Sequence, residues 1–285
     1  MNDDKSKLIL INVLLYRIFG HKKIKLQNNE VYFKEISNLE KIKDNNKFIQ
    51  TEFENFKLYF FDLNNLQIPI YMYFTAIGIY IDFVIKQYSY FNDIEISASK
   101  NDIVIDGGGC WGDTSLYFAN EVGNHGKVYS FEFVPKNLNI FRKNLSLNQH
   151  LCNVIEVIEK PIWNISDKKL YYIDNGPASK ISFIKNEDFK GETETISIDD
   201  FVIRNKLEKL NFIKLDIEGA ELNALLGGVN AIKKFKPNLA IALYHNPIDF
   251  YNIPKFINDL NLGYKFYLKH LTIHKEETIL FASTN

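Results

Sequence analysis

The chain reads Val104-Ile105-Asp106-Gly107-Gly108-Gly109-Cys110-Trp111-Gly112-Asp113-Thr114 where a strand, a glycine turn and a helix are expected to meet. Apolar β-branched residues precede the turn, and Asp113 and Thr114 follow it, as is typical of a helix start. Glycines let the backbone N–H groups at a helix N-terminus approach a ligand without a clash from Cβ. The stretch therefore predicts a ligand-binding turn between a buried strand and a helix.

The glycines in this turn fit two cofactor patterns. Gly107, Gly109 and Gly112 satisfy the G-x-G-x-x-G pattern of a dinucleotide site. Asp106, Gly108 and Gly112 satisfy the alternative pattern D-x-G-x-x-x-G. A carboxylate before the turn would face the pyrophosphate of NAD, whereas S-adenosylmethionine has no phosphate and carries an ammonium and a sulfonium group. Asp106 thus favours S-adenosylmethionine, and an NAD-dependent oxidoreductase stays open as the alternative.

A second acidic residue stands at the end of the next apolar run. Glu132 follows residues 128–131 and lies 20 positions beyond Gly112. An acidic side chain at this place can accept hydrogen bonds from ribose hydroxyls. Because both cofactors contain a ribose, Glu132 predicts adenosine binding without deciding between them.

Apolar runs alternate with amphipathic stretches from residue 101 onward, which predicts an α/β fold with a doubly wound parallel sheet buried on both faces. Two further apolar runs near the end of the chain predict a hairpin that closes the sheet. The strands are expected at 103–105, 128–131, 154–158, 212–215, 239–243, 264–268 and 278–281, and the helices at 114–122, 135–148, 218–226 and 247–260.

Three carboxylates follow the apolar run at 212–215. The segment Lys214-Leu215-Asp216-Ile217-Glu218-Gly219-Ala220-Glu221-Leu222 crosses from a strand into a helix, at the edge of a parallel sheet where ligands bind. Glu218 and Glu221 are three residues apart, so they share a face of the first helical turn. The segment predicts an acidic site next to the glycine turn.

The chain resembles the FkbM family of S-adenosylmethionine-dependent methyltransferases from about Phe83 to Phe281. The resemblance implies a Rossmann-like sheet of seven strands with one antiparallel, and O-methylation of hydroxyl groups, often on sugars or secondary metabolites. Gly109-Cys110-Trp111 departs from the commoner Ala-Asn-hydrophobic form of the loop. The similar segments are Asp106 to Ala119, Phe131 to Pro135, Asn144, Asn148, Lys214 to Leu222, 244–247 and 264–270.

Methyl transfer to a hydroxyl needs alignment of the acceptor and a group that removes its proton. His245 is expected as the general base because it follows a strand and has a suitable intrinsic pKa, with Asp216 and Glu218 as the other catalytic candidates. The alternative to a general base is an Mg²⁺ ion held by Asp216, Glu218 and Glu221. Carboxylates at a helix N-terminus are also stabilised by the helix dipole without a metal, so no metal is assigned. The expected cofactor-binding residues are Asp106, Gly107, Gly108, Gly112, Asp113, Thr114, Glu132 and Asp216.

Composition limits the partners. The net charge of −1 over 285 residues argues against electrostatic binding of nucleic acid. The resemblance implies a small molecule or a glycan as the acceptor. Two cysteines are too few for a disulfide framework and predict a cytoplasmic protein. Residues Leu8 to Phe19 are apolar but too short to cross a bilayer, which predicts a packed helix, with attachment to a membrane surface as the alternative.

The first part of the chain lacks the strand and helix alternation. Residues 1–95 are predicted to form a helix-rich N-terminal extension that contacts a partner or the substrate, and residues 96–285 the cofactor-binding domain. Ile68 to Ile85 indicates a strand followed by a helix. Tyr88 and Tyr90 belong to an aromatic cluster in front of the glycine turn. Most of its rings are expected to be core, and the remainder, which changes at Tyr88 and Tyr90 would test, to offer a stacking surface to an adenine or a sugar ring. A non-catalytic module that binds the cofactor is the third functional hypothesis.

Overall fold

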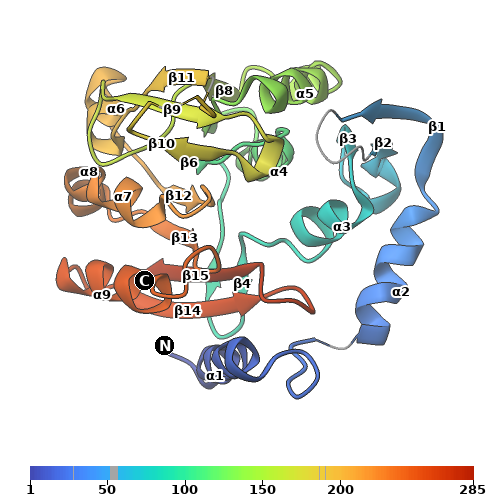
Figure 1. Ribbon diagram of the computed structural model, residues 1–285, viewed down its shortest axis with the longest axis horizontal. Coiled ribbons are helices and arrows are strands. Elements are labelled where there is room, and N and C mark those ends of the chain that lie inside the picture. Colours follow the sequence, from blue (N-terminus) through green and yellow to red (C-terminus); the bar gives the residue numbers. More distant parts are fainter. Residues whose placement is uncertain (28, 52–56, 186, 190) are drawn as a thin grey trace.

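The computed structural model describes residues 1–27, 29–51, 57–185, 187–189 and 191–285. Its main sheet contains β6 (Ile103–Gly107), β7 (Lys127–Phe131), β8 (Ile155–Ile158), β12 (Phe212–Leu215), β13 (Asn238–Ala242), β14 (Lys265–His270) and β15 (Thr278–Ser283). The spatial order is β14-β15-β13-β12-β6-β7-β8 (Figure 1). Only β15 runs opposite to its neighbours. The predicted α/β sheet of seven strands with one antiparallel is confirmed.

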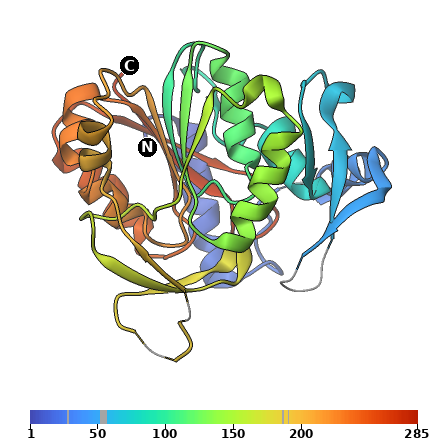
Figure 2. The same cartoon turned by 90° about the horizontal axis from the view of Figure 1, so that it is seen from above.

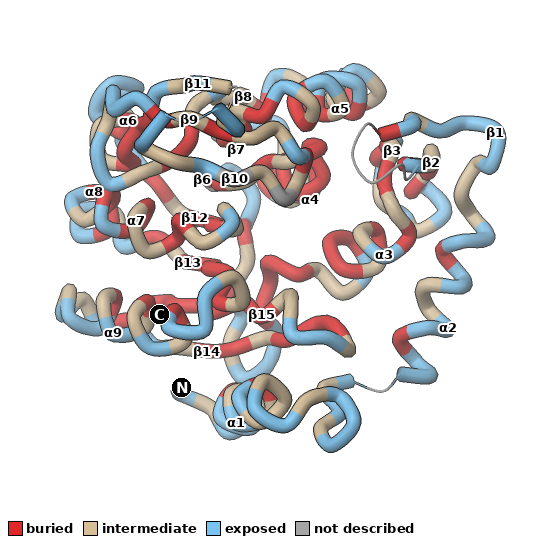
Figure 3. The backbone as a smooth tube through the Cα atoms, in the orientation of Figure 1, coloured by how far each residue is buried: buried red, intermediate tan, exposed pale blue. Residues whose placement is uncertain are grey.

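Helices cover both faces of this sheet (Figure 2). They are α4 (Asp113–Val122) and α5 (Pro135–Ser146), and on the other face α6 (Ile198–Arg204), α7 (Glu221–Leu226), α8 (Val229–Phe235) and α9 (Asp249–Asp259). Successive strand residues point to opposite faces, so Val104 packs with Phe118 of α4 and Ile105 packs in the cluster of Phe201 of α6. The strands β6, β12, β13 and β15 are buried along nearly their whole length (Figure 3), which explains their nearly continuous apolar sequence.

The N-terminal part contains more strand than its sequence suggests. It comprises α1 (Asp4–Phe19), α2 (Asn29–Glu40), the antiparallel sheet β1 (Lys43–Gln50), β2 (Lys57–Asp62) and β3 (Tyr71–Phe74), the short η1 (Leu63–Leu66) and α3 (Ala76–Gly78), a π-helix η2 (Ile79–Val84), and the hairpin β4 (Tyr90–Phe91) and β5 (Glu95–Ile96). The predicted strand and helix between 68 and 85 are confirmed as β3 followed by α3 and η2. The three-stranded sheet was not predicted.

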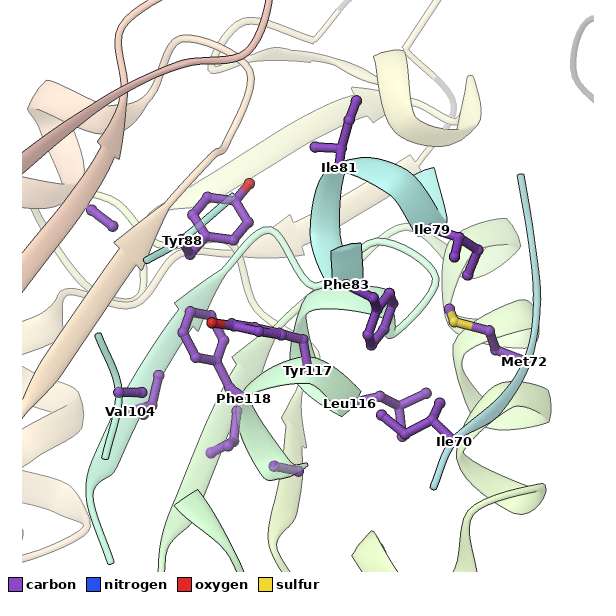
Figure 4. Packing of buried hydrophobic residues seen from close by; sticks show 14 of the residues in the cluster. Ile70, Met72, Ile79, Ile81, Phe83, Tyr88, Val104, Leu116, Tyr117 and Phe118 are labelled. Carbon is purple, nitrogen blue, oxygen red and sulfur yellow. The ribbon is translucent and has the colours of Figure 1, made fainter. Parts of the chain in front are cut away.

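This N-terminal part shares one hydrophobic core with the main sheet. Phe83 of η2 packs against Tyr117 of α4, whereas Ile79 lies beside Met72 of β3 (Figure 4). The Phe83 and Tyr117 rings meet edge to face at 6.2 Å. The side chains of Asn144 in α5 and of Asn148, two residues beyond the end of α5, hydrogen-bond the backbone of β3 at 2.6 to 3.1 Å. The π-helix is thereby fixed against the start of the predicted cofactor domain, and the boundary at residue 95 stays a prediction.

The expected aromatic stacking surface is wrong for Tyr88 and Tyr90. Both side chains are buried, 3% and 2% exposed, because they pack inside the shared core on Phe118 and on Tyr267 and Phe281. Neither ring offers a face to a ligand.

A small antiparallel sheet lies between β8 and β12 in the sequence. It consists of β9 (Lys169–Ile173), β10 (Lys180–Ser182) and β11 (Gly191–Glu194), with the short helices η3 (Gln149–Leu151) and η4 (Gly176–Ala178) nearby in sequence. The helix expected at Leu8 to Phe19 is α1, which packs on β14 and leaves Leu8 and Ile18 exposed. Among the helices that the structure describes, none has the length and apolar character to cross a bilayer.

Candidate functional site

The parallel strands β6, β7 and β12 have their carboxyl ends on the same side of the main sheet, which we call the site edge. The turns that follow these strands contain the predicted site residues. Gly108, in the turn after β6, has a φ of +84°, and a Cβ there would lie 2.0 Å from the backbone oxygen of Asp216. Glycine is therefore required at this position. The Asp216 backbone N–H donates to the carbonyl of Gly107 at 3.1 Å. The glycine turn and the acidic segment after β12 are in direct contact.

Asp106 is completely buried and faces side chains of its own chain. Lys214 Nζ lies 3.0 Å from Asp106 Oδ1 and is also buried, while the hydroxyls of Thr114 and Ser115 donate to Asp106 at 3.0 and 2.6 Å. Lys214 Nζ also donates to the carbonyl of Gly108 at 2.7 Å. This buried ion pair ties β6, β12 and the start of α4 together. A direct contact of Asp106 or Thr114 with a cofactor stays a prediction.

Glu132 follows β7 and is held in a fixed orientation. Its Oε1 accepts the backbone N–H groups of Phe133 and Val134, both at 2.7 Å, and its Oε2 accepts from the Asn137 side chain at 3.1 Å. The Cys110 backbone in the glycine turn also hydrogen-bonds it. Burial raises the pKa of Glu132 to about 7 in spite of these bonds. Oε2 retains acceptor capacity for a further donor.

Asp113 begins α4 and is 8% exposed. Its Oδ1 is buried and has no hydrogen-bond partner among the residues that the structure describes. Burial raises the pKa of Asp113 to about 6, although the charge of Lys214 opposes this. Of the two residues predicted at the helix start, Thr114 donates its hydroxyl to Asp106 of the buried ion pair, whereas Asp113 has a carboxylate oxygen that accepts no hydrogen bond from the described residues.

Asp216, Glu218, Glu221 and His245 gather at the site edge, and we call this group the acidic centre. His245, after β13, places Nδ1 2.9 Å from Glu221 Oε1 and Nε2 3.4 Å from Asp216 Oδ1. Glu218 Oε1 lies 3.6 Å from the same Nε2 and is half exposed. The structure thus brings together all three residues predicted to be catalytic.

Glu221 has a role that its sequence position does not reveal. It is completely buried, and its Oε1 accepts the backbone N–H of Ile217 at 2.8 Å in addition to its bond with the His245 ring. A carboxylate that bonds Nδ1 fixes the orientation of a histidine ring. Glu221 therefore directs Nε2 of His245 toward Asp216.

Two tyrosines complete the surroundings of Asp216, and the sequence analysis assigned this role to neither. The Tyr88 hydroxyl donates to Asp216 Oδ2 at 2.7 Å, and the Tyr244 hydroxyl lies 2.9 and 3.0 Å from the two carboxylate oxygens. Burial, followed by the charge of Asp216, raises the pKa of both tyrosines well above its usual value, so both remain donors. The signal that pointed toward Tyr88 was the aromatic cluster, interpreted there as a stacking surface.

The His245 ring is a cation in this arrangement. Burial lowers its pKa, but the nearby carboxylates of Glu218, Glu221 and Asp216 outweigh burial and raise the pKa to about 11. Both ring nitrogens therefore carry a proton at neutral pH. A ring that already carries both protons cannot accept another, which argues against the predicted role of His245 as the general base.

Three residues of the acidic centre also have the composition of a cation site. Asp216, Glu221 and His245 each offer one ligand atom, and these atoms lie within 4.8 Å of one another. The Asp216 oxygens already accept from two tyrosines, and Glu221 Oε1 already accepts from His245 and the backbone. Asp216 Oδ2 and Glu221 Oε1 are thus engaged within the chain, whereas Glu221 Oε2 and His245 Nε2 are buried and have no hydrogen-bond partner among the described residues.

Two surface pockets of the described structure lie away from these residues. One, of about 420 Å³, is lined by residues of η1, η2 and α4, including the Lys86–Glu121 ion pair. The other, of about 340 Å³, lies between α1 and β14. Neither includes Glu132, Asp216 or His245, so the site is assigned from the chemistry of its side chains rather than from the size of a hollow.

Comparison with known proteins identifies the fold and the domain. The family described as Methyltransferase FkbM domain matches residues 95–266. A crystal structure of a methyltransferase FkbM from Methylobacillus flagellatus KT is similar with 23% identity and a TM-score of 0.53, over 69% of this chain and 47% of that chain. This chain therefore spans about half the length of that relative. The expected resemblance and fold class are confirmed.

More distant solved structures are also similar. A putative O-methyltransferase from Klebsiella pneumoniae has 8% identity and a TM-score of 0.43 over 97% of this chain and 96% of that chain. Fibrillarin from Aeropyrum pernix, in complex with natively bound S-adenosyl-L-methionine, has 15% identity and a TM-score of 0.42 over 66% and 69%. These two likenesses are too distant to bear on function. None of the curated proteins compared matches the chain.

Proposed function

The chain belongs to the FkbM methyltransferase family, and from this premise we propose that it transfers a methyl group from S-adenosylmethionine to a hydroxyl oxygen of a sugar, glycan or secondary metabolite. The observation that carries the proposal is the direct contact between the glycine turn and the segment of Asp216. Glu132, a carboxylate suited to binding a ribose, lies at the same end of the sheet as Asp216, which can take up a proton. Methyl transfer to a hydroxyl requires both functions.

The residues at the site edge fit S-adenosylmethionine. Glu132 Oε2 holds a single side-chain hydrogen bond and can accept another from a ribose hydroxyl. The cofactor carries two positive groups, and Asp113 with the acidic centre offers buried negative charge. NAD would instead bring a pyrophosphate to an edge rich in carboxylates, which weakens the oxidoreductase alternative.

Asp216 is the residue to which we assign the acceptor's proton. When bound, S-adenosylmethionine supplies an electrophilic methyl group, so the chain has to align the acceptor oxygen and remove its proton. The hydroxyls of Tyr88 and Tyr244 hold the Asp216 carboxylate in place, and its Oδ1 takes up the proton. Alignment contributes roughly 7–11 kcal/mol in favourable systems, so a fixed carboxylate at this point serves both needs.

His245 has a different role in this proposal from the one its sequence position indicated. A ring whose pKa is about 11 has no free nitrogen to accept a proton at neutral pH. Held by Glu221, it presents a charged Nε2–H 3.4 Å from Asp216 Oδ1. We assign it the positioning of Asp216 and the stabilisation of negative charge on the acceptor oxygen.

Calorimetric titration with S-adenosylhomocysteine, the product form of the cofactor, tests the proposal. Binding in the micromolar to high-micromolar range is expected for the full chain. Absence of binding, together with thermal stabilisation by NADH, would instead favour the oxidoreductase. Binding without methyl transfer to any fraction of a cell extract would favour a non-catalytic module.

Replacing Glu132 with glutamine is expected to weaken S-adenosylhomocysteine binding by roughly 1.5–3 kcal/mol, the range for hydrogen bonds to a charged group. Glutamine keeps the size of the side chain and one acceptor oxygen, so the change isolates the carboxylate. Isothermal calorimetry measures the effect, and Glu40→Gln at the exposed end of α2 is the matched control. Equal affinity in both variants would remove Glu132 from the cofactor site.

Chelation of divalent cations is expected to leave methyl transfer unchanged. The reason is that a His245 ring with a pKa of about 11 carries a proton on both nitrogens and offers no lone pair to a metal. Asp216 Oδ2 and Glu221 Oε1 also each accept at least two hydrogen bonds from the chain. The assay is transfer of radiolabelled methyl after dialysis against EDTA, with and without added Mg²⁺. A loss of transfer that Mg²⁺ restores would establish a metal at Asp216, Glu221 and His245.

The acceptor is the part of the proposal that needs a screen. The segments outside the proposed cofactor and proton-transfer residues that we expect to contact it are residues 163–196, which include the small sheet β10-β9-β11, and the N-terminal part. Radiolabelled S-adenosylmethionine incubated with fractionated cell extract is expected to label a glycan or small-molecule fraction. Exclusive labelling of RNA or protein would contradict the proposed acceptor class.

A further inference from the structure

A buried carboxyl pair joins the N-terminal part to the start of α4, and the proposed mechanism leaves it unused. Asp82 lies in the π-helix η2 and is 6% exposed. Its carboxyl group is hydrogen-bonded to that of Asp113. Asp113 is 8% exposed, and its Oδ1 has no hydrogen-bond partner in the described part of the chain. Two carboxyl groups therefore meet in the interior beside the glycine turn.

The charge around this pair is unbalanced. Asp82 is surrounded by the charges of Asp113, Glu277 and Lys214, and Asp113 by those of Lys214, Asp106 and Asp82. Lys214 is a cation that acts on both carboxyl groups, but it is already in a buried ion pair with Asp106 at 3.0 Å. Burial raises the pKa of both Asp82 and Asp113, as expected for carboxyls that lack a cation. A ligand cation would correct this deficit.

The position of the pair identifies the cation. Asp113 directly follows the glycine turn after β6, and β6 lies between β7, which Glu132 follows, and β12, which Asp216 follows. We propose that Asp82 and Asp113 together bind the α-ammonium group of S-adenosylmethionine, so that a residue outside the family match at 95–266 completes the cofactor site. This inference rests on the proposed function. It gives the N-terminal part a defined task, which is to recognise the amino-acid end of the cofactor.

The packing of η2 explains why this residue can reach the turn. Phe83 anchors the π-helix on Tyr117 of α4, and Ile79 anchors it beside Met72 of β3 (Figure 4). Asp82 lies between these anchors in sequence and is carried to the beginning of α4. Two carboxylates around one ammonium give a charge-assisted site that rejects adenosyl ligands lacking the amino-acid portion.

Two ligands separate this role from a structural one. S-adenosylhomocysteine carries the α-ammonium, whereas 5′-methylthioadenosine has the same nucleoside without the amino-acid portion. In Asp82→Asn, affinity for S-adenosylhomocysteine is expected to fall roughly tenfold to hundredfold, while affinity for 5′-methylthioadenosine stays as in the wild type. Calorimetry with the two ligands gives both values, and Asp93→Asn in the exposed turn after β4 is the matched control.

The outcomes are distinguishable. Unchanged S-adenosylhomocysteine affinity, or an equal loss for both ligands, would overturn the ammonium site. Asp113→Asn must show the same selective loss, and it serves as the second variant if Asp82→Asn does not fold. If the wild type binds neither ligand, the proposed function itself fails, and the ammonium site fails with it.

Discussion

Replacing Lys214 with methionine is expected to lower the free energy of unfolding by about 3–5 kcal/mol, the range for removing one partner of a buried ion pair. Lys214 is 1% exposed, and Asp106 is completely buried. Methionine fills a similar volume but leaves the Asp106 charge in the interior, with only hydroxyl donors from residues such as Thr114 and Ser115. The carbonyl of Gly108 also loses its donor, so the glycine turn is expected to loosen.

Urea denaturation followed by circular dichroism measures this effect. The double variant Asp106→Asn with Lys214→Met is expected to be less destabilised than the sum of the single variants, because the isolated charge is gone. Lys255→Met breaks an exposed ion pair with Asp259 on α9 and serves as the control, with little change expected. Additive single effects would show that the two side chains do not interact.

The glycine turn and the acidic segment were predictable because each is local. A strand, a turn and a helix start follow one another between 103 and 122, and spacing alone reveals their order. The edge shared by Glu132 and Asp216 follows from the rule that parallel strands place their carboxyl ends together. The hairpin of β14 and β15 was predictable for the same reason, because two apolar runs flank a short polar segment.

The contacts that define the site chemistry are long-range and were not predictable. Lys214 reaches Gly108 across 106 positions, and Tyr88 reaches Asp216 across 128. The carboxylate of Asp106 is paired with Lys214, and nothing in the local sequence around either residue indicates this pairing. A buried tyrosine hydroxyl and a stacking tyrosine look the same in sequence, and only the packing of η2 decides between them.

The burial of Asp82 in the π-helix is a second feature that the sequence could not predict. The sequence of this helix, Ile79 to Val84, contains an acidic residue among apolar ones, and such a residue on a helix is usually exposed. Packing on α4 and the shared core with the main sheet bury Asp82 instead. The tertiary position of the helix therefore determines whether its carboxylate is a surface charge or part of a site.

Asp216→Asn is expected to lower the rate of methyl transfer by roughly 10²- to 10⁴-fold, the usual contribution of a general base, with a much smaller effect on S-adenosylhomocysteine affinity. Asparagine keeps the shape of the side chain and can still accept from Tyr88 or Tyr244, but it cannot take up the acceptor's proton. The rate is measured with radiolabelled cofactor on the labelled acceptor fraction, and Asp259→Asn at the exposed end of α9 is the control.

The pH dependence separates Asp216 from His245 as the base. If neutral His245 accepted the proton, the rate would rise about tenfold per pH unit from pH 7 toward the pKa of about 11, because each unit multiplies the small neutral fraction by ten. With Asp216 as base, His245 stays protonated through this range and its titration adds no such rise. His245→Gln, which keeps a donor near Asp216 without the charge, is then expected to slow transfer less than Asp216→Asn. The reverse order, with a steep rise in the wild type, would return the proton to His245.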